Sequence, residues 1–203
     1  EEGAANKMAG WLHVLVVAVA VGMSAFHLYT AYSIVPTQTL RPVHVGFVLF
    51  LIFLVFPVAM RYRHRIMWWD WLAAALSIAI VVYLILGGDD FTDRNTSPLP
   101  WDIAFGVALI VLVLEAMRRS NGWVMPVVTL CFIAYALAGP VLPAPWTHKG
   151  YEVGRLVGVM YMTLEGIYGV AIDVSSSLII LFTIFGAFLQ YSGAGKFYID
   201  FRS

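Results

Sequence analysis

Residues 68–86 read WWDWLAAALSIAIVVYLIL, a run in which Asp70 is the single charged side chain. An α-helix rises about 1.5 Å per residue, so about 20 apolar residues cross the ~30 Å hydrocarbon core of a bilayer. The apolar residues are continuous and do not alternate with polar ones, as they would in a membrane-spanning β-strand. The stretch therefore predicts a transmembrane helix that ends at Gly87 and Gly88.

The rest of the chain contains five more runs of this kind. We expect further spans at Trp11–Ile34, Val43–Met60, Trp101–Met117, Trp123–Leu142 and Val174–Tyr191. Pro36 and the pair Arg41-Pro42 are expected to end the first span and to separate it from the second, because the residue before a proline is biased away from helix.

The stretch from Gly150 to Glu165 is too charged to span. Glu152 and Arg155 lie near its start, which leaves Leu156–Leu164 as the uncharged part. A run this short indicates an interfacial helix or a re-entrant segment. The predicted fold is therefore an all-α integral membrane protein with about six transmembrane helices plus one interfacial or re-entrant helix.

The composition of the whole chain excludes several classes of protein. Hydrophobic residues make up 61% of the 203 residues and charged residues 12%, which leaves too little polar surface for a soluble globule or a disordered chain. Lys and Arg together number 12, as do Asp and Glu, so no basic surface is available for nucleic acid. A lone cysteine, Cys131, excludes a disulfide scaffold.

Loop charges predict the orientation of the spans. Basic side chains gather in two loops, which hold Arg61, Arg63 and Arg65, and Arg118 and Arg119. Acidic side chains gather in the loop between them, which holds Asp89, Asp90 and Asp93. Because cytoplasmic loops carry the excess of Lys and Arg, we expect both basic loops and the N-terminus in the cytoplasm. The loop with Arg61, Arg63 and Arg65 also suits anionic lipid head groups, although a purely topological role is the simpler interpretation.

Several stretches resemble a known transporter family. They are Leu114–Arg119 running into Gly122–Pro126, Ile133–Pro140, Glu165–Val170, Leu181–Leu189 and Ser192–Phe197. The first two resemble the junction in fused membrane components of tripartite ATP-independent periplasmic (TRAP) transporters. The tract from Glu165 onward is similar to the opening of the large membrane domain in the TAXI-type subtype.

The resemblance implies a division of the chain and a function. Residues 1–120 are expected to form a four-helix small membrane domain, a scaffold, and residues 121–203 the first helices of an incomplete large permease domain. The implied activity is sodium-coupled uptake of a small organic anion across the bacterial inner membrane. The implied partners are the remainder of the large domain, a soluble periplasmic binding protein and membrane lipids. The sodium ion belongs to the complete transporter and is not expected to bind this chain alone.

Polar residues near the last span are candidates for an ion or substrate pathway. Carboxylates and hydroxyls at membrane depth are costly and often mark such pathways. The candidates here are Glu165, Asp173, Ser175, Ser176 and Ser177. The alternative is that Asp173 and Ser175 cap the start of the last helix, and we prefer that interpretation.

Three glycines recur at four-residue steps. Gly150, Gly154 and Gly158 would share one helical face, and small residues at this spacing let another helix approach closely. The face is expected either to pack against the remainder of the permease or to belong to an interfacial helix without such a partner.

A cytochrome-b-like haem-binding membrane anchor is the main alternative function, and a structural membrane assembly subunit is a further alternative. His13 and His27 lie on one side of the first predicted span, a spacing that suits axial haem ligands. His44 and His64 do not form the matching pair that two haems need, so hydrogen-bonding histidines are the preferred interpretation. Neither a nucleophile–base arrangement nor a metal-ligand cluster is recognisable, so the sequence does not predict an enzyme.

Overall fold

The computed structural model describes residue 6, residues 10–62 and residues 66–193. This part of the chain is helical and contains no strand. Its helices are α1 Trp11–Tyr32, α2 Thr37–Val55, α3 Trp68–Asp93, α4 Pro100–Asn121, α5 Val124–Ala138, α6 Val153–Met162, α7 Val170–Val174 and α8 Ile180–Tyr191. Within the described residues, six stretches are long and apolar enough to cross a membrane, with Val170–Tyr191 counted as one. The predicted all-α membrane fold is confirmed.

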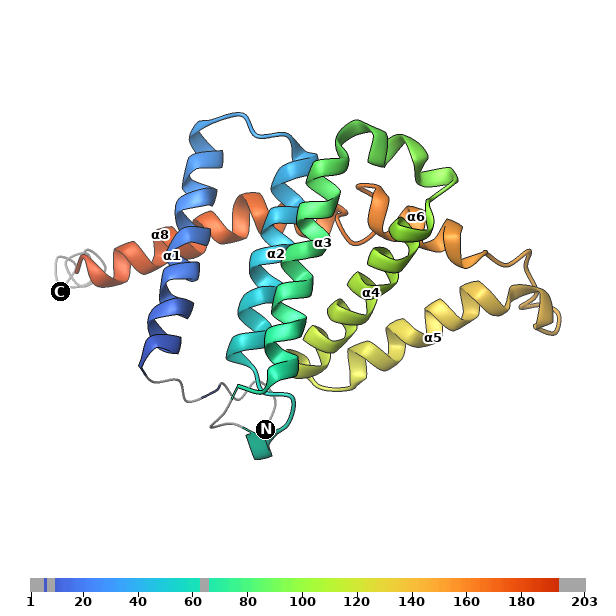
Figure 1. Cartoon of the computed structure of the whole chain (residues 1–203), viewed down its shortest axis with the longest axis horizontal. Coiled ribbons are helices and arrows are strands. Elements are labelled where there is room, and N and C mark those ends of the chain that lie inside the picture. Colours follow the sequence, from blue (N-terminus) through green and yellow to red (C-terminus); the bar gives the residue numbers. More distant parts are fainter. Residues whose placement is uncertain (1–5, 7–9, 63–65, 194–203) are drawn as a thin grey trace, which may run out of the picture.

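Helices α1 to α4 run up and down beside one another (Figure 1). The centre of this group contains Phe53 of α2, Ala74 and Ile80 of α3 and Leu109 of α4, all fully buried. In α1, by contrast, only Met23 and His27 are buried. Lipid tails are as apolar as these side chains, so close packing and polar contacts hold such helices together.

The boundary between the first two spans differs from the prediction. Helix α2 begins at Thr37 and contains Arg41 and Pro42, so the expected break at Arg41-Pro42 is wrong. A proline in the second turn removes a single backbone hydrogen bond, and the packing of α2 on α3 outweighs this cost. The helix also ends earlier than predicted, at Val55, because Pro57 follows and disfavours helical geometry before it.

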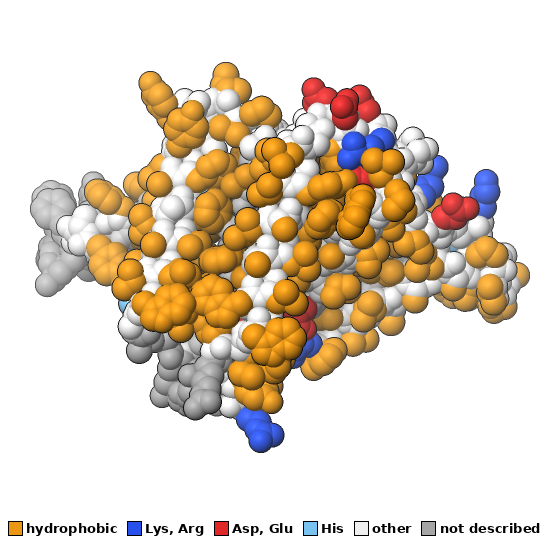
Figure 2. All heavy atoms as spheres, in the orientation of Figure 1, with side chains coloured by type: hydrophobic (Ala, Val, Ile, Leu, Met, Phe, Trp, Pro, Cys, Tyr) orange, Lys and Arg blue, Asp and Glu red, His pale blue; other side chains and the backbone are white. Residues whose placement is uncertain are grey.

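The predicted stop of the third span appears as a kink. Gly88 has φ 53° and ψ −140°, outside the helical region, and the chain then resumes a helical turn as far as Asp93. The acidic residues at 89, 90 and 93 therefore lie in a short helical extension of α3. Figure 2 shows acidic side chains gathered at this end of the bundle and a basic side chain at the opposite end.

The short helix α6 is docked on the bundle. It packs against α4 and against the 3₁₀ turn Arg94–Thr96 that joins α3 to α4. Val157 and Tyr161 are buried in this contact, and the Tyr161 hydroxyl donates to the Ile80 carbonyl at 3.0 Å. Whether this ten-residue helix is interfacial or re-entrant remains a prediction.

The last helix runs across the others. Helices α7 and α8 continue into one another through the π-helical turn Ser175–Ile179, so the final span begins at Val170 rather than Val174. In Figure 1 this helix crosses α2 and α1 instead of lying alongside them. Its contacts agree, because α7 meets α2 and α8 meets α1.

Candidate functional site

The polar centre of the molecule lies where α2 meets α7. Arg41 and His44 are three residues apart on α2 and therefore share a face. The Arg41 guanidinium contacts Asp173 Oδ1 through Nη2 at 2.9 Å and through Nε at 3.1 Å. Its Nη1 donates to the carbonyl oxygen of Tyr168 at 2.9 Å. Arg41 thus joins α2 both to α7 and to the loop that precedes α7.

A directed chain of hydrogen bonds lies beside this ion pair. His27 Nδ1 is 2.7 Å from the Met23 carbonyl, which can only accept, so this nitrogen carries the hydrogen. With both rings neutral, His27 Nε2 then accepts from His44 Nδ1 at 2.9 Å. His44 Nε2 in turn accepts from the Ser175 hydroxyl at 3.1 Å. Side chains from three helices, both histidines buried, therefore form one chain from Ser175 to Met23.

The predicted pathway residues do not come together as one oxygen cluster. Glu165 is exposed in the loop before α7, where its backbone N–H donates to Thr163 Oγ1 at 3.2 Å. Ser176 and Ser177 both donate to the Asp173 carbonyl, at 3.2 and 2.6 Å. Asp173 itself faces a guanidinium cation. In the described residues, no three His, Cys, Asp or Glu side chains are grouped closely enough to hold a metal ion.

The preferred capping role of Asp173 and Ser175 is wrong. The helix already begins at Val170, so both residues lie inside it and neither satisfies free N–H groups at its start. Serine hydroxyls that bond a carbonyl three or four residues back are a common alternative within a helix, and they accompany the π-helical turn here.

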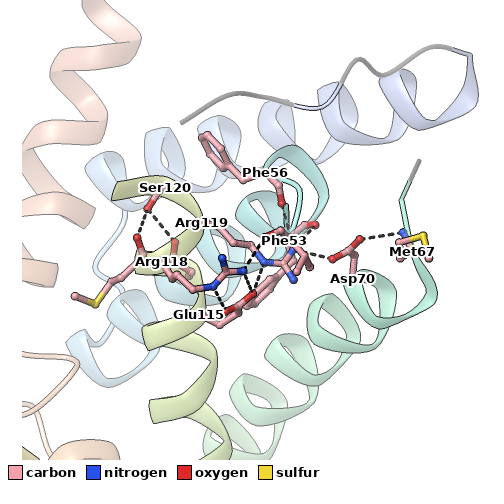
Figure 3. A network of polar contacts seen from close by, with 11 residues as sticks. Phe53, Phe56, Met67, Asp70, Glu115, Arg118, Arg119 and Ser120 are labelled. Carbon is pink, nitrogen blue, oxygen red and sulfur yellow. Dashed lines mark hydrogen bonds and ion pairs between the residues drawn. The ribbon is translucent and has the colours of Figure 1, made fainter. Parts of the chain in front are cut away.

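A second ion network joins the ends of α2, α3 and α4 (Figure 3). Arg119 contacts Asp70 Oδ1 at 2.7 Å and Glu115 Oε1 at 2.8 Å, and it donates to the Phe56 carbonyl at 3.1 Å. Arg118 holds Glu115 with two hydrogen bonds of 2.7 Å. Arg118 and Arg119 therefore belong to the last turns of α4 and are paired, whereas the sequence analysis placed them in a loop.

A third ion pair closes the opposite end of the bundle. The Asp102 carboxylate is fully buried and accepts from Arg94 Nε at 2.8 Å and Nη2 at 3.0 Å. The Tyr83 hydroxyl adds a bond of 2.8 Å. The Leu99 N–H also donates to Asp102, at 2.9 Å. This arrangement fixes the turn between α3 and α4.

The glycine face is shorter than predicted. Gly150 lies before α6 with φ 72°, so it is outside the helix. Gly158 lies so close to the Asn95 carbonyl that a Cβ would collide with it, whereas Gly154 faces Ile103 and Pro98 with room for a methyl group. Both glycines on α6 therefore face the α3–α4 connection of this same chain.

The basic loop is described in part. Arg61 is exposed in the 3₁₀ turn Met60–Tyr62. Arg63 and Arg65 lie outside the described residues, so their lipid-binding role stays a prediction.

Arg41 and His44 are site residues that the sequence did not indicate. Hydropathy places Arg41 in a break between two predicted spans and His44 near the start of the second. Arg41 and His44 are three residues apart, so they share one helical face when the helix begins at Thr37. This spacing is the feature of the sequence that could have indicated a shared site. Their partners at Asp173 and Ser175 lie more than 130 residues away, and the spacing does not reveal them.

Comparison with known proteins gives one similarity, in the C-terminal part of the chain. Residues 108–203 match the family model described as tripartite ATP-independent periplasmic transporter, DctM component. The match begins inside α4 and covers α5 to α8. No curated protein and no solved structure matches the chain. The match does not test the TAXI subtype, which stays a prediction. The chain therefore has the helices of a multi-pass membrane protein, and its residues 108–203 are similar to the DctM component of TRAP transporters.

Proposed function

We propose that this chain is a scaffold component of a TRAP-type secondary transporter. In this proposal the transporter is sodium-coupled and imports a small organic anion that a soluble periplasmic binding protein delivers. The similarity of residues 108–203 to the DctM component carries the proposal, because this segment contains the crossing helix.

The arrangement of charged residues supports a static role. Ion pairs join α2 to α7 and α3 to α4, and a third pair holds the 3₁₀ turn Arg94–Thr96 against the start of α4. The carboxylates in these pairs already accept from guanidinium groups. Because the guanidinium groups neutralise them, these carboxylates are poor ligands for a sodium ion. Ion pairs of this kind hold helices in fixed relation, which suits a component against which another part moves.

Exposed apolar surfaces support the proposed partners. Large side chains project from α8, among them Phe182, Phe185 and Phe188, and none of the residues in α8 is buried. In a membrane such a surface contacts lipid or another apolar helix. We assign it to the remainder of the large permease component, with lipids around it, in a bacterial inner membrane and with the N-terminus in the cytoplasm.

The hydrogen bonds of His27 favour the scaffold proposal over the haem alternative. Haem ligation needs a free imidazole nitrogen, but both nitrogens of His27 lie in the hydrogen-bond chain described above. Coordination through His27 would break the link to His44 or to Met23. We therefore do not propose a haem protein.

Reconstitution tests the proposed function. The full chain is placed in liposomes with an inward sodium gradient and the soluble receptor, and a panel of radiolabelled small carboxylates serves as the probe. We expect no accumulation by this chain alone. Adding the large permease component should start accumulation, because a movable substrate site of discontinuous helices is then supplied.

Ion replacement and receptor omission provide the controls. Replacing external sodium with choline should abolish uptake, and so should leaving out the receptor. Accumulation by this chain alone would mean that a complete substrate site exists within it and would refute the scaffold role. Uptake that persists in choline would refute the sodium coupling.

A further inference from the structure

We infer that Arg41 and His44 are positioning residues that fix the helix Val170–Tyr191 across the N-terminal helices. The polar clamp consists of Arg41, His44 and His27 on the N-terminal side and of Asp173, Ser175 and the Tyr168 carbonyl on the DctM side. The inference rests on the proposed function for its transport readout alone, and its structural readout is independent of transport.

The clamped helix has little other support from this chain. Among residues 170–191 only Ser176 is buried, and every aromatic side chain of α8 is exposed. Apolar contacts in a lipid environment give weak orientation, because a lipid tail replaces one apolar neighbour with another. Hydrogen bonds in a low-dielectric setting are directional and costly to leave unmade. The polar contacts therefore determine where this helix crosses the bundle.

Arg41 fixes two separate parts of the DctM segment. Nε and Nη2 contact the Asp173 carboxylate on α7, while Nη1 reaches the Tyr168 carbonyl, two residues before α7 begins at Val170. A planar guanidinium holds its donors in a rigid fork, so both contacts together define one position. The compact ammonium of lysine lacks this fork and cannot hold both acceptors in the same fixed arrangement.

The histidines extend the clamp from α2 to α1. The rings of His27 and His44 meet edge to face, with an angle of 81° between their planes and centroids 5.0 Å apart. His27 is held by the carbonyl of Met23 in its own helix, so its Nε2 presents a fixed acceptor to His44. His44 then presents a fixed acceptor to Ser175. These hydrogen bonds therefore connect α1, through α2, to the π-helical turn Ser175–Ile179.

Hydrogen–deuterium exchange of the full chain in lipid nanodiscs tests this inference. The variants are Arg41→Gln, Arg41→Lys, Ser175→Ala and the charge-exchanged double variant Arg41→Asp with Asp173→Arg. Arg155→Gln is the matched control, because Arg155 is an exposed arginine on α6 outside the clamp. Exchange is followed in residues 163–180 and, as an internal reference, in α4.

We expect Arg41→Gln to raise the exchange rate of residues 163–180 by about tenfold while α4 stays unchanged, because local opening becomes easier where the clamp was. Ser175→Ala should give a smaller rise, and Arg41→Lys an intermediate one. The charge-exchanged variant should restore part of the protection, which a merely space-filling role for Arg41 would not allow. Arg155→Gln should leave both regions unchanged.

Equal exchange in Arg41→Gln and the unaltered chain would overturn the inference. If Arg41→Gln does not fold, the charge-exchanged variant decides the matter: a folded chain with protected residues 163–180 supports the clamp, and no recovery refutes it. In the complete transporter, Arg41→Gln should lower uptake and the charge-exchanged variant should raise it again. Absence of uptake by the unaltered transporter would count against the proposed function and would leave the exchange result standing.

Discussion

Replacing Arg119 with methionine tests whether the ion network at the ends of α2, α3 and α4 stabilises the bundle. Arg119 and Asp70 each have 3% of their side-chain surface exposed, so the change leaves a carboxylate buried without its cation. The Met67 N–H still donates to Asp70 at 2.9 Å, but it carries no full charge. Glu115 keeps both of its bonds to Arg118. The loss of stability in Arg119→Met should therefore arise mainly from the unpaired Asp70 carboxylate.

The expected loss of unfolding free energy is about 3–5 kcal/mol, the range for removing one partner of a buried ion pair. Asp70→Asn should cost less, about 1–3 kcal/mol, because asparagine still accepts from Met67 and Arg119 still holds Glu115. The double variant, Arg119→Met with Asp70→Asn, removes both charges. Its loss of unfolding free energy should be smaller than the sum of the losses in the two single variants. We expect a coupling free energy of about 2 kcal/mol between the two positions.

Reversible unfolding by sodium dodecyl sulfate in mixed micelles, followed by circular dichroism, measures these free energies. Arg118→Met is the matched control, since it removes the neighbouring and more exposed guanidinium and leaves the Arg119–Asp70 pair intact. This control should lose clearly less stability than Arg119→Met. Additive losses in the double variant, or equal losses at the two arginines, would refute the argument that a buried, uncompensated carboxylate is the cause.

Three further predictions concern other parts of the fold. In a cysteine-free background, an impermeant maleimide should label Asp90→Cys in intact cells and Arg61→Cys only after permeabilisation, and the reverse pattern would invert the topology. Gly158→Ala should lower the unfolding free energy by about 1–3 kcal/mol, because its Cβ meets a backbone carbonyl, whereas Gly154→Ala should change thermal stability little; equal effects would contradict the packing described. Burial raises the pKa of the Tyr168 phenol, so the hydroxyl stays protonated, and it has no hydrogen-bond partner in the described structure. Tyr168→Phe should therefore not lower the melting temperature. A clear drop would contradict this and would reveal a bound water.

Six helices were predictable because one physical requirement dominates their composition. A helix in lipid satisfies its own backbone groups and needs apolar side chains all along its length, so hydropathy marks each span directly. Boundaries were less predictable, since they depend on local competition. At Pro42 the packing of α2 on α3 outweighs a missing hydrogen bond, whereas α2 ends at Val55, two residues before Pro57.

The course of the last helix could not be predicted from its own residues. The run from Val174 to Tyr191 has the length and hydropathy of a span, and nothing in it specifies that it crosses α2 and α1. That geometry depends on Arg41 and His44, which lie in a different span. Asp173 and Ser175 stand out in the sequence as unusual polar residues, which suggests either a pathway or a helix cap, and their neighbours do not reveal the contacts with α2.

Charged residues within an apolar chain have two general uses, and the structure separates them here. A residue that binds a ligand needs open acceptor or donor positions, while a residue that joins helices has these positions filled by another helix. Asp70, Asp102 and Asp173 each accept from an arginine that lies elsewhere in the chain. Because desolvation makes an unpaired carboxylate costly, each pair also excludes alternative helix arrangements in which the two partners are apart. Asp70, Asp102 and Asp173 therefore serve to hold the described segments together in this structure.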